Sequence, residues 1–223
     1  MFKAIIIGGT GATGKQLLNQ LISNQNCDLV TSIGRRPVLN GEKNDKLVDI
    51  VVESLSNLSS TAKYWKDNDV FFNCIGTTRK RAGGAKEFID IEYGISNEAA
   101  KMAAVAKIPH ASLISANGAN HNIWAKDWIP PLLYMKTIGQ KEQTILSSFS
   151  FNSVSIFKPG MLIRLQGKQS WLGRFSESRD FGIRVDTLAS AMIHDAERVK
   201  LGLVEKSPQF FIGNIDIKCS LGL

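Results

Sequence analysis

The sequence is poor in the residues that build metal centres and disulfide frameworks. Its 223 residues contain only three cysteines, at positions 27, 74 and 219, and only three histidines, at positions 110, 121 and 194. None of them form a Cys-x-x-Cys pair or a Cys/His spacing that is typical of zinc sites. We therefore expect neither a bound metal nor a disulfide framework, and unpaired thiols suit a reducing compartment.

Long apolar runs are also missing. No stretch reaches the roughly 18 residues that indicate a membrane-spanning helix, so we expect no integral membrane segment. The amino-terminal residues MFKAIIIGGTG lead directly into a buried strand and leave no space for a cleavable signal peptide. The sequence therefore predicts a cytoplasmic protein.

Acidic residues are outnumbered by basic ones. The chain has 27 Lys and Arg against 20 Asp and Glu, which gives a net charge of +7. Such a surface attracts phosphate groups, including those of nucleotide cofactors. The longest basic run is the three residues Arg79–Arg81, and no stacking-aromatic motif or recognition helix accompanies it, so nucleic-acid binding is disfavoured.

Short apolar segments alternate with longer helical ones along the whole chain. Strands are expected over residues 3–7, 29–33, 47–52, 70–75, 112–115, 154–157 and 210–212, and helices over 14–22, 86–106, 131–146 and 186–199, the last capped by Asp186. Strands that alternate with helices of this length predict right-handed crossovers and a parallel sheet. We predict one α/β domain over residues 1–223, a doubly wound Rossmann-type fold. The glycine-containing residues 158–184 would form a small irregular lobe on the substrate side.

A glycine-rich loop, GGTGATG, follows the first strand and opens the first helix. In this context the pattern is typical of a dinucleotide site, because glycines allow the tight turn and the close approach of a pyrophosphate to the helix amino terminus. The alternative is a tight turn without a ligand. We predict that the cofactor contacts Gly8, Thr10, Gly11, Ala12, Thr13 and Gly14.

The end of the second strand indicates which dinucleotide would bind. A carboxylate there favours NAD, whereas an arginine accepts the 2′-phosphate of NADP. The sequence reads SIGRRP, with Arg35 and Arg36, so we predict NADP(H); the alternative is a pair of solvated arginines. Glu53, after the third strand, is a candidate contact to the adenine or a loop cap.

Two further strand ends complete the predicted cofactor site. After the fourth strand, Gly76 allows the backbone to lie against the cofactor and Thr77 offers a hydroxyl, while Cys74 is expected to be a packed thiol with its backbone at the site. After the sixth strand, the corresponding candidates are Pro159, Gly160 and Met161.

These pieces together resemble a known family. GGTGATG at 8–14, GRRP at 34–37, IGTTRKRAG at 75–83, SANGA at 115–119 and FKPG at 157–160 occur in family order. The chain resembles an atypical short-chain dehydrogenase/reductase, and more narrowly the HIV Tat-interacting oxidoreductase-like family. The resemblance implies a tyrosine that handles the proton, a lysine four residues later that binds the nicotinamide ribose, and a serine that holds the substrate oxygen.

Carried over to this sequence, the tyrosine is Tyr134 and the serine is Ser115, but the lysine position holds Ile138. Lys136 would point to the other side of the helix. Lys141 would share the face of Tyr134, but roughly 10 Å further along the axis. An arginine is also usual where this chain has Lys158. We predict that Tyr134 and Ser115 are catalytic, and that a reductase without the lysine would be slow.

Two functions follow from this pattern. The first is NADPH-dependent reduction of a small carbonyl substrate by hydride transfer, possible but impaired without the lysine. The second is a non-catalytic, NADPH-dependent regulatory protein that binds protein partners, a role that the resemblance also allows. Trp124, Trp128 and Trp171 are expected near the substrate mouth, where ordinary packing would explain them equally well.

Overall fold

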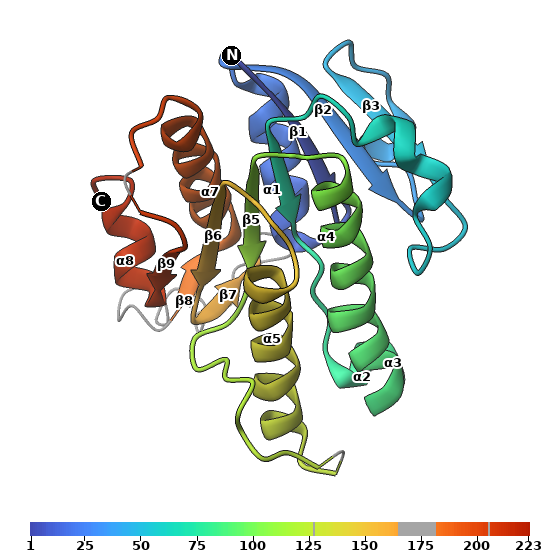
Figure 1. Ribbon diagram of the computed structural model, residues 1–223, viewed down its shortest axis with the longest axis vertical. Helices are drawn as coiled ribbons and strands as arrows, with labels where there is room; N and C mark the ends of the chain where they lie inside the picture. The colour runs from blue at the N-terminus through green and yellow to red at the C-terminus, as the bar shows by residue number, and fades with distance from the viewer. Residues whose placement is uncertain (127, 165–181, 205) are drawn as a thin grey trace.

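A computed structural model describes residues 1–126, 128–164, 182–204 and 206–223. Its central feature is a sheet of seven parallel strands in the order β3-β2-β1-β4-β5-β6-β9 (Figure 1). The strands are Phe2–Ile7 (β1), Cys27–Gly34 (β2), Leu47–Val51 (β3), Val70–Asn73 (β4), His110–Ile114 (β5), Ser153–Lys158 (β6) and Gln209–Ile212 (β9). The predicted doubly wound α/β fold is confirmed.

The strand order contains one reversal of direction. The chain moves outward from β1 to β2 and β3, then returns to place β4 on the other side of β1. In doubly wound sheets, ligands bind beside the carboxyl ends of the strands at such a reversal. The reversal between β1 and β4 therefore marks the edge of the sheet where a ligand site is expected.

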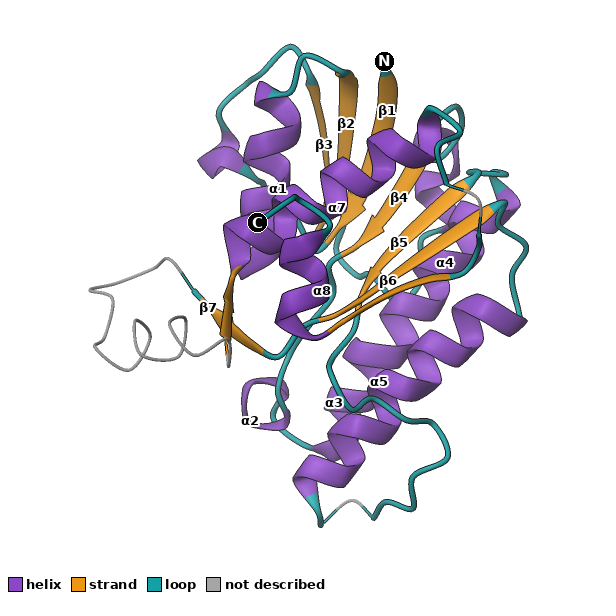
Figure 2. Ribbon diagram, turned by 90° about the vertical axis from the view of Figure 1, so that its left-hand side faces the viewer, coloured by secondary structure: helices purple, strands orange, loops and turns teal. Residues whose placement is uncertain are grey.

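Helices cover both faces of this sheet, as parallel strands require (Figure 2). One face carries α1, α7 and α8, and the other carries η2, α4 and α5. These elements span Ala12–Ser23 (α1), Val185–Lys200 (α7), Gly213–Cys219 (α8), Ser59–Tyr64 (η2), Ser96–Val105 (α4) and Pro130–Ser147 (α5). Shorter helical turns are Leu39–Gly41 (η1), Arg79–Ala82 (α2), Ala85–Ile89 (α3) and Asp90–Ile95 (η3).

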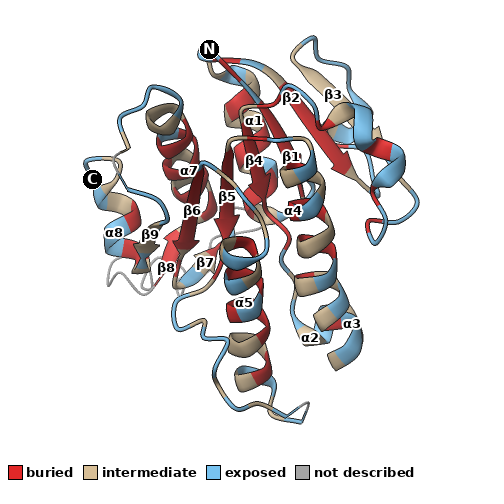
Figure 3. Cartoon of the chain, in the orientation of Figure 1, coloured by how far each residue is buried: buried red, intermediate tan, exposed pale blue. Residues whose placement is uncertain are grey.

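Alternating side chains of the strands build two cores, one on each face of the sheet. Ile6 and Phe72 pack with α1 and α7, whereas Ile5, Ile7 and Phe71 pack with α4 and α5. The central strands are buried almost throughout (Figure 3). This explains why their sequences read as nearly continuous apolar runs.

The long helix predicted over residues 86–106 is helical as far as Val105, but it is not one continuous α-helix. It consists of α3, the π-helical turn η3 and α4. A π-turn accommodates one extra residue, so it changes which side chains face inward, and such turns are frequent at functional sites. Here the turn carries Glu92 inward to 1% exposure.

The predicted cap at Asp186 is also wrong. Helix α7 begins at Val185, and Arg184 precedes it in extended conformation. Asp186 lies in the first turn, where its carboxylate accepts hydrogen bonds from the Arg184 guanidinium and from Thr187 N–H. A carboxylate in the first turn favours the helix through its dipole.

The basic run Arg79–Arg81 lies in the short helix α2. The Thr78 hydroxyl accepts a hydrogen bond from Arg81 N–H and caps it. In the expected lobe, Met161–Ile163 (β7) pairs in parallel with Gly182–Arg184 (β8). Residues 165–181 of that lobe, including Trp171, lie outside the described residues.

Among the described residues, no helix is long and apolar enough to cross a membrane. No group of three or more His, Cys, Asp or Glu side chains in this part of the chain could hold a metal ion.

Candidate functional site

The glycine loop turns tightly at the carboxyl end of β1. Gly8 has a φ of +89°, and a Cβ there would lie 2.6 Å from Cys74 O at the end of β4. A Cβ on Gly14 would collide with Gly8 O. These two glycines therefore permit the loop to pack against β4 and α1 against the loop, which is how the fingerprint uses its first and third glycines.

The amino terminus of α1 is open to an anion. Its cap is Gly11, which provides no side-chain hydrogen bond, and the first turn contains no acidic residue. Thr10 and Gly11 are exposed, whereas Thr13 is buried. Uncapped amide groups and an uncompensated helix dipole suit a phosphate. The residues present therefore fit the pyrophosphate of a dinucleotide.

The polar residues predicted at the ends of β2 and β3 lie on the same edge of the sheet. Arg35 and Arg36 directly follow Gly34, the last residue of β2, and both are exposed. Glu53 is exposed two residues beyond β3. The two guanidinium groups suit a 2′-phosphate because each stays charged and offers a planar set of donors.

Three side chains hydrogen-bond to the backbone of the loop after β4. Asn73 Oδ1 accepts a hydrogen bond from Ile75 N–H at 3.3 Å. Lys141 Nζ donates to Ile75 O at 3.3 Å. Glu92 Oε1 accepts from Thr77 N–H in a short hydrogen bond. Neither Glu92 nor this use of Lys141 was predicted, since the π-turn that turns Glu92 inward has no clear sequence pattern.

A second polar group lies around Ser115, directly after β5. The Ser115 hydroxyl donates to Glu142 Oε1 in a short hydrogen bond, and Lys158 Nζ lies 2.9 Å from Glu142 Oε2. Glu142 was not predicted. Glu142 directly follows Lys141 on α5. Because adjacent residues of a helix point in different directions, Lys141 contacts the loop after β4 and Glu142 contacts Ser115 after β5.

Gly139 explains the close fit between α5 and the loop that follows Ser115. A Cβ at this position would collide with the backbone of Asn120 and His121. Asn120 N–H donates to Met135 O at 3.1 Å, which fastens the loop to the helix. The glycine five residues after Tyr134 thus sets the register between the helix and the Ser115 loop.

Tyr134 lies near the start of α5, beside a cavity of about 300 Å³. Its ring centroid is 5.9 Å from that of Phe88. Burial, and then the negative charge of Glu92, raise the pKa of Tyr134 to about 12. Ile138, in the lysine position, is buried in the apolar interior at 2% exposure. The cavity is lined by Thr78, Arg79, Lys80, Phe88, Pro130, Pro131, Leu133 and Tyr134.

The remaining candidates vary in their exposure. Pro159 is buried, Gly160 N–H donates to Asn214 Oδ1 at 2.9 Å, and Met161 is 57% exposed. Trp124 and Trp128, on the loop before α5, are exposed rather than packed, at 62% and 71%.

Cys74, the first residue after β4, has a packed thiol, as expected. It is 8% exposed, and burial raises the pKa of its thiol to about 12. A thiol with so high a pKa is poorly nucleophilic at neutral pH.

Comparison with solved structures supports the fold. The dTDP-glucose 4,6-dehydratase DesIV from Streptomyces venezuelae, solved with NAD, superposes with a TM-score of 0.68 over 95% of this chain and 75% of that chain, at 13% identity. The oxidoreductase ylbE from Lactococcus lactis gives a TM-score of 0.60 over 86% and 85%, at 15% identity. At these identities the likeness concerns the fold alone.

Comparison with curated sequences supplies the family, although no family model matches the chain. The mitochondrial protein FMP52 of Meyerozyma guilliermondii is 34% identical over 163 residues, which cover 72% of this chain and 65% of that protein, just under two thirds of its length. Rat protein HTATIP2 is 30% identical over 185 residues, covering 83% of this chain and 72% of the relative. The chain belongs to the family of HTATIP2 and FMP52 proteins, atypical members of the short-chain dehydrogenases/reductases.

Proposed function

We propose that the protein binds NADP(H) and reduces a carbonyl compound by hydride transfer. The observation that carries this proposal is the glycine loop with the open amino terminus of α1, at the reversal of strand order between β1 and β4. DesIV, which shares the fold, was solved with NAD. Arg35 and Arg36 at the end of β2 favour the 2′-phosphate of NADP over the free hydroxyl of NAD.

In this proposal Gly8, Thr10, Gly11, Ala12, Thr13 and Gly14 hold the pyrophosphate, Arg35 and Arg36 the 2′-phosphate, and Glu53 lies toward the adenine. Gly76, Thr77, Pro159, Gly160 and Met161, with the backbone of Cys74, line the ribose and nicotinamide. When bound, the dihydronicotinamide supplies the hydride.

The side chains around the carbonyl supply the proton and orient the oxygen. Tyr134, with a pKa of about 12, is protonated at neutral pH and can donate its proton to the developing alkoxide. Ser115 is placed to hydrogen-bond the substrate oxygen, and to donate to it the hydroxyl must rotate its single proton away from Glu142, which accepts that proton in this structure and is itself paired with Lys158. The high pKa of Tyr134 disfavours the reverse reaction, which needs a phenolate base.

The cavity beside Tyr134 suits a small carbonyl compound with an apolar body. Phe88, Leu133 and two prolines line it, together with Thr78, Arg79 and Lys80. Pockets of this kind bury an apolar ligand and orient it with a few polar groups. The substrate side of the proposal therefore rests on this cavity and on the hydroxyl of Tyr134.

Paired calorimetric titrations with NADPH and NADH test the cofactor. We expect NADPH to bind more tightly, and the double variant Arg35→Ala/Arg36→Ala to lose most of that preference while keeping its affinity for NADH. Lys80→Ala is the matched control, since it removes a cation from the same edge without touching the predicted 2′-phosphate site. Absence of binding to both cofactors would refute the proposal and leave GGTGATG as a structural turn.

A second function, NADPH-dependent regulation of a protein partner without turnover, is favoured by one observation. Ile138 is buried where the family has a lysine, so no ammonium at that position lowers the pKa of Tyr134. Ile138→Lys discriminates between the two functions: it should raise carbonyl reduction if the catalytic groups are otherwise in place, and change nothing if the protein only binds the cofactor.

The location of the protein stays a prediction. We expected the cytoplasm, whereas the FMP52 relatives are named as mitochondrial proteins. Fractionation of cells that express the tagged full chain would decide between the two compartments.

A further inference from the structure

Lys141, on α5, is buried in the candidate site but has no part in the proposed chemistry. Its ammonium lies 3.2 Å from Glu92 Oε2, and the two side chains are only 4% and 2% exposed. Two charges removed from water cost free energy unless their remaining donors and acceptors are also satisfied. Here those remaining groups bond to the backbone of the loop Ile75–Thr77.

The backbone of the loop Ile75–Thr77 is held by hydrogen bonds to side chains rather than by those of a strand or helix. Lys141 binds the carbonyl of Ile75, Glu92 binds the N–H of Thr77, and Asn73 binds the N–H of Ile75. Buried backbone groups must find partners, so the positions of these side chains fix the path of the loop. Two of the three contacts come from one ion pair.

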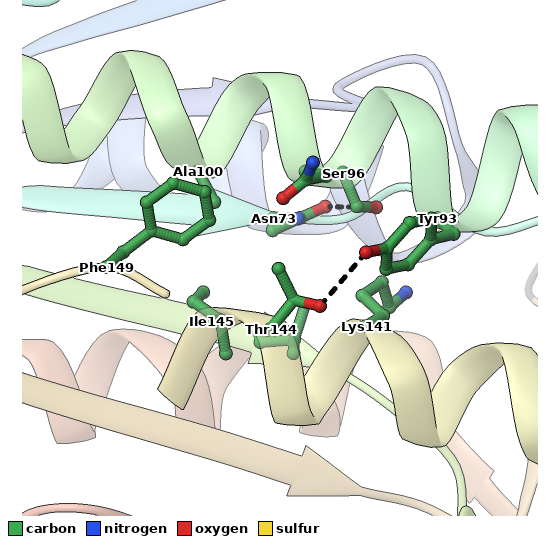
Figure 4. Close-up of a pocket in the computed structure, with 10 residues that line it drawn as sticks. Asn73, Tyr93, Ser96, Ala100, Lys141, Thr144, Ile145 and Phe149 are labelled. Carbon is green, nitrogen blue, oxygen red and sulfur yellow. Dashed lines mark hydrogen bonds between the residues drawn. The ribbon is translucent and has the colours of Figure 1, made fainter. Parts of the chain in front are cut away.

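The surroundings of Lys141 leave it little freedom to move. Figure 4 shows it on α5, opposite Tyr93 of η3, beside a cavity of about 10 Å³ that Asn73, Tyr93 and Ser96 also line. That volume holds about one water molecule. Thr144 Oγ1 donates to Tyr93 Oη at 3.2 Å beside it, which links α5 to the π-turn η3.

The same loop forms one wall of the proposed cofactor cleft. Its first residues follow Cys74, whose carbonyl lies 2.6 Å from where a Cβ on Gly8 would be. The loop after β4 and the glycine loop are therefore in direct contact at the reversal of strand order. A change in the path of Ile75–Thr77 would alter the shape of this cleft without removing any group that binds the cofactor.

We propose that Lys141 is a positioning residue: with Glu92 it fixes the loop Ile75–Thr77 as a wall of the cofactor cleft. This inference rests on the proposed function and deepens it. The chain carries its buried cation at position 141 rather than 138, about 4.5 Å further along the helix. From there the ammonium acts on the cofactor through the loop and not by contact.

Two measurements on Lys141→Met test this inference, with Ile145→Ala as the matched control. Ile145 lies one turn further along α5, is 3% exposed, and has an apolar side chain that cannot hydrogen-bond the loop. Both variants should lower the melting temperature. Only Lys141→Met should speed amide hydrogen exchange of residues 75–78 in cofactor-free protein and weaken NADPH binding, by roughly ten-fold.

The double variant Lys141→Met/Glu92→Gln sharpens the test. A glutamine carbonyl can still accept the Thr77 N–H and leaves no unpaired buried charge, so exchange and affinity should return toward wild type. In turnover, Lys141→Met should raise the KM for NADPH more than it lowers kcat.

Unchanged exchange at residues 75–78 in Lys141→Met, with only a lower melting temperature, would overturn the inference and leave the pair as a packing element. An equal loss of NADPH affinity in Ile145→Ala would also overturn it. If the wild-type protein binds neither NADPH nor NADH, the proposed function fails instead, and the exchange measurement alone still decides whether Lys141 holds the loop.

Discussion

The two edges of the sheet both contain buried polar clusters, but these are built differently. At the carboxyl edge, Lys141 and Glu92 form an ion pair, and both bond to loop backbone. At the amino edge, His110 Nε2 lies 3.0 Å from Ser155 Oγ and 3.6 Å from Asp195 Oδ2, and Gln209 donates to Asp195.

Within the part of the chain that the structure describes, the hydrogen bonds of the amino-edge cluster join side chains, and His110 Nδ1 and Asp195 Oδ2 have no hydrogen-bond partner. Burial lowers the pKa of His110 to about 3 and raises the pKa of Asp195. Both shifts favour the neutral forms. An ion pair thus lies where a loop has to be held, whereas the neutral forms are favoured where the side chains only fill the core.

The largest expected difference between the two edges of the sheet is the effect of a substitution on the rate of carbonyl reduction. Tyr134→Phe keeps the packing against Phe88 but removes the hydroxyl, so we expect carbonyl reduction to fall by about 10²–10⁴-fold. NADPH affinity, measured by calorimetry, should not change. Ser155→Ala at the amino edge is the control and should leave turnover as in wild type. Unchanged turnover in Tyr134→Phe with any reactive carbonyl would remove Tyr134 from the mechanism.

A smaller effect concerns the pH dependence of the two reaction directions. With a Tyr134 pKa of about 12, the phenol stays protonated from pH 6 to 9, so reduction should be nearly independent of pH in this range. Alcohol oxidation needs the phenolate and should rise about ten-fold per pH unit. Glu92→Gln removes a charge that raises this pKa, and oxidation at a given pH should become faster. A plateau in oxidation below pH 9 would contradict the raised pKa.

The smallest effect is on stability at the amino edge. His110 is neutral when folded at pH values where the unfolded chain binds a proton, so stability should be lost as pH falls from about 6.5 toward 3, by up to about 1.4 kcal/mol per pH unit. The raised pKa of Asp195 acts in the opposite direction: its contribution is present at low pH and is lost as pH rises through its folded pKa.

Urea unfolding at pH 7 and pH 5 separates the two groups. His110→Gln should abolish the loss of stability at pH 5, whereas Asp195→Asn, which removes the opposing contribution, should increase it. If both variants lose as much stability on acidification as wild type, the pH dependence lies outside this cluster.

The parts of the fold that follow from periodicity could be predicted from the sequence. All seven strands of the main sheet and their parallel arrangement were expected, because buried parallel strands leave continuous apolar runs such as KAIII and VFFNCI. The π-turn at Asp90–Ile95 was not expected, since its residues have ordinary helical propensities and tertiary contacts decide the extra residue. Helix α8 was missed because seven residues are too few for a helical period to be recognised.

Some residues of the candidate site could be identified from the sequence and others could not. Glycines and arginines that follow strand ends were identified because a parallel sheet gathers those ends at one edge, and whether they bind a cofactor stays a prediction. Glu92 and Glu142 were missed, because a buried carboxylate looks like a surface one until its lysine partner is known. Lys141 was correctly placed on the face of α5 that carries Tyr134. Its role in holding a loop was missed, because only its distance from Tyr134 was considered.

The π-turn also determines which side chains of the helical segment 85–105 face the same direction before and after it. One additional residue in a turn rotates everything that follows by about 100° around the axis. Phe88, before the turn, can therefore face Tyr134, while Ala99 and Ala103, after it, face the sheet. Deleting a single residue between 90 and 95 would rotate one of these two sets away from its partner, so this segment should tolerate substitutions far better than changes in length.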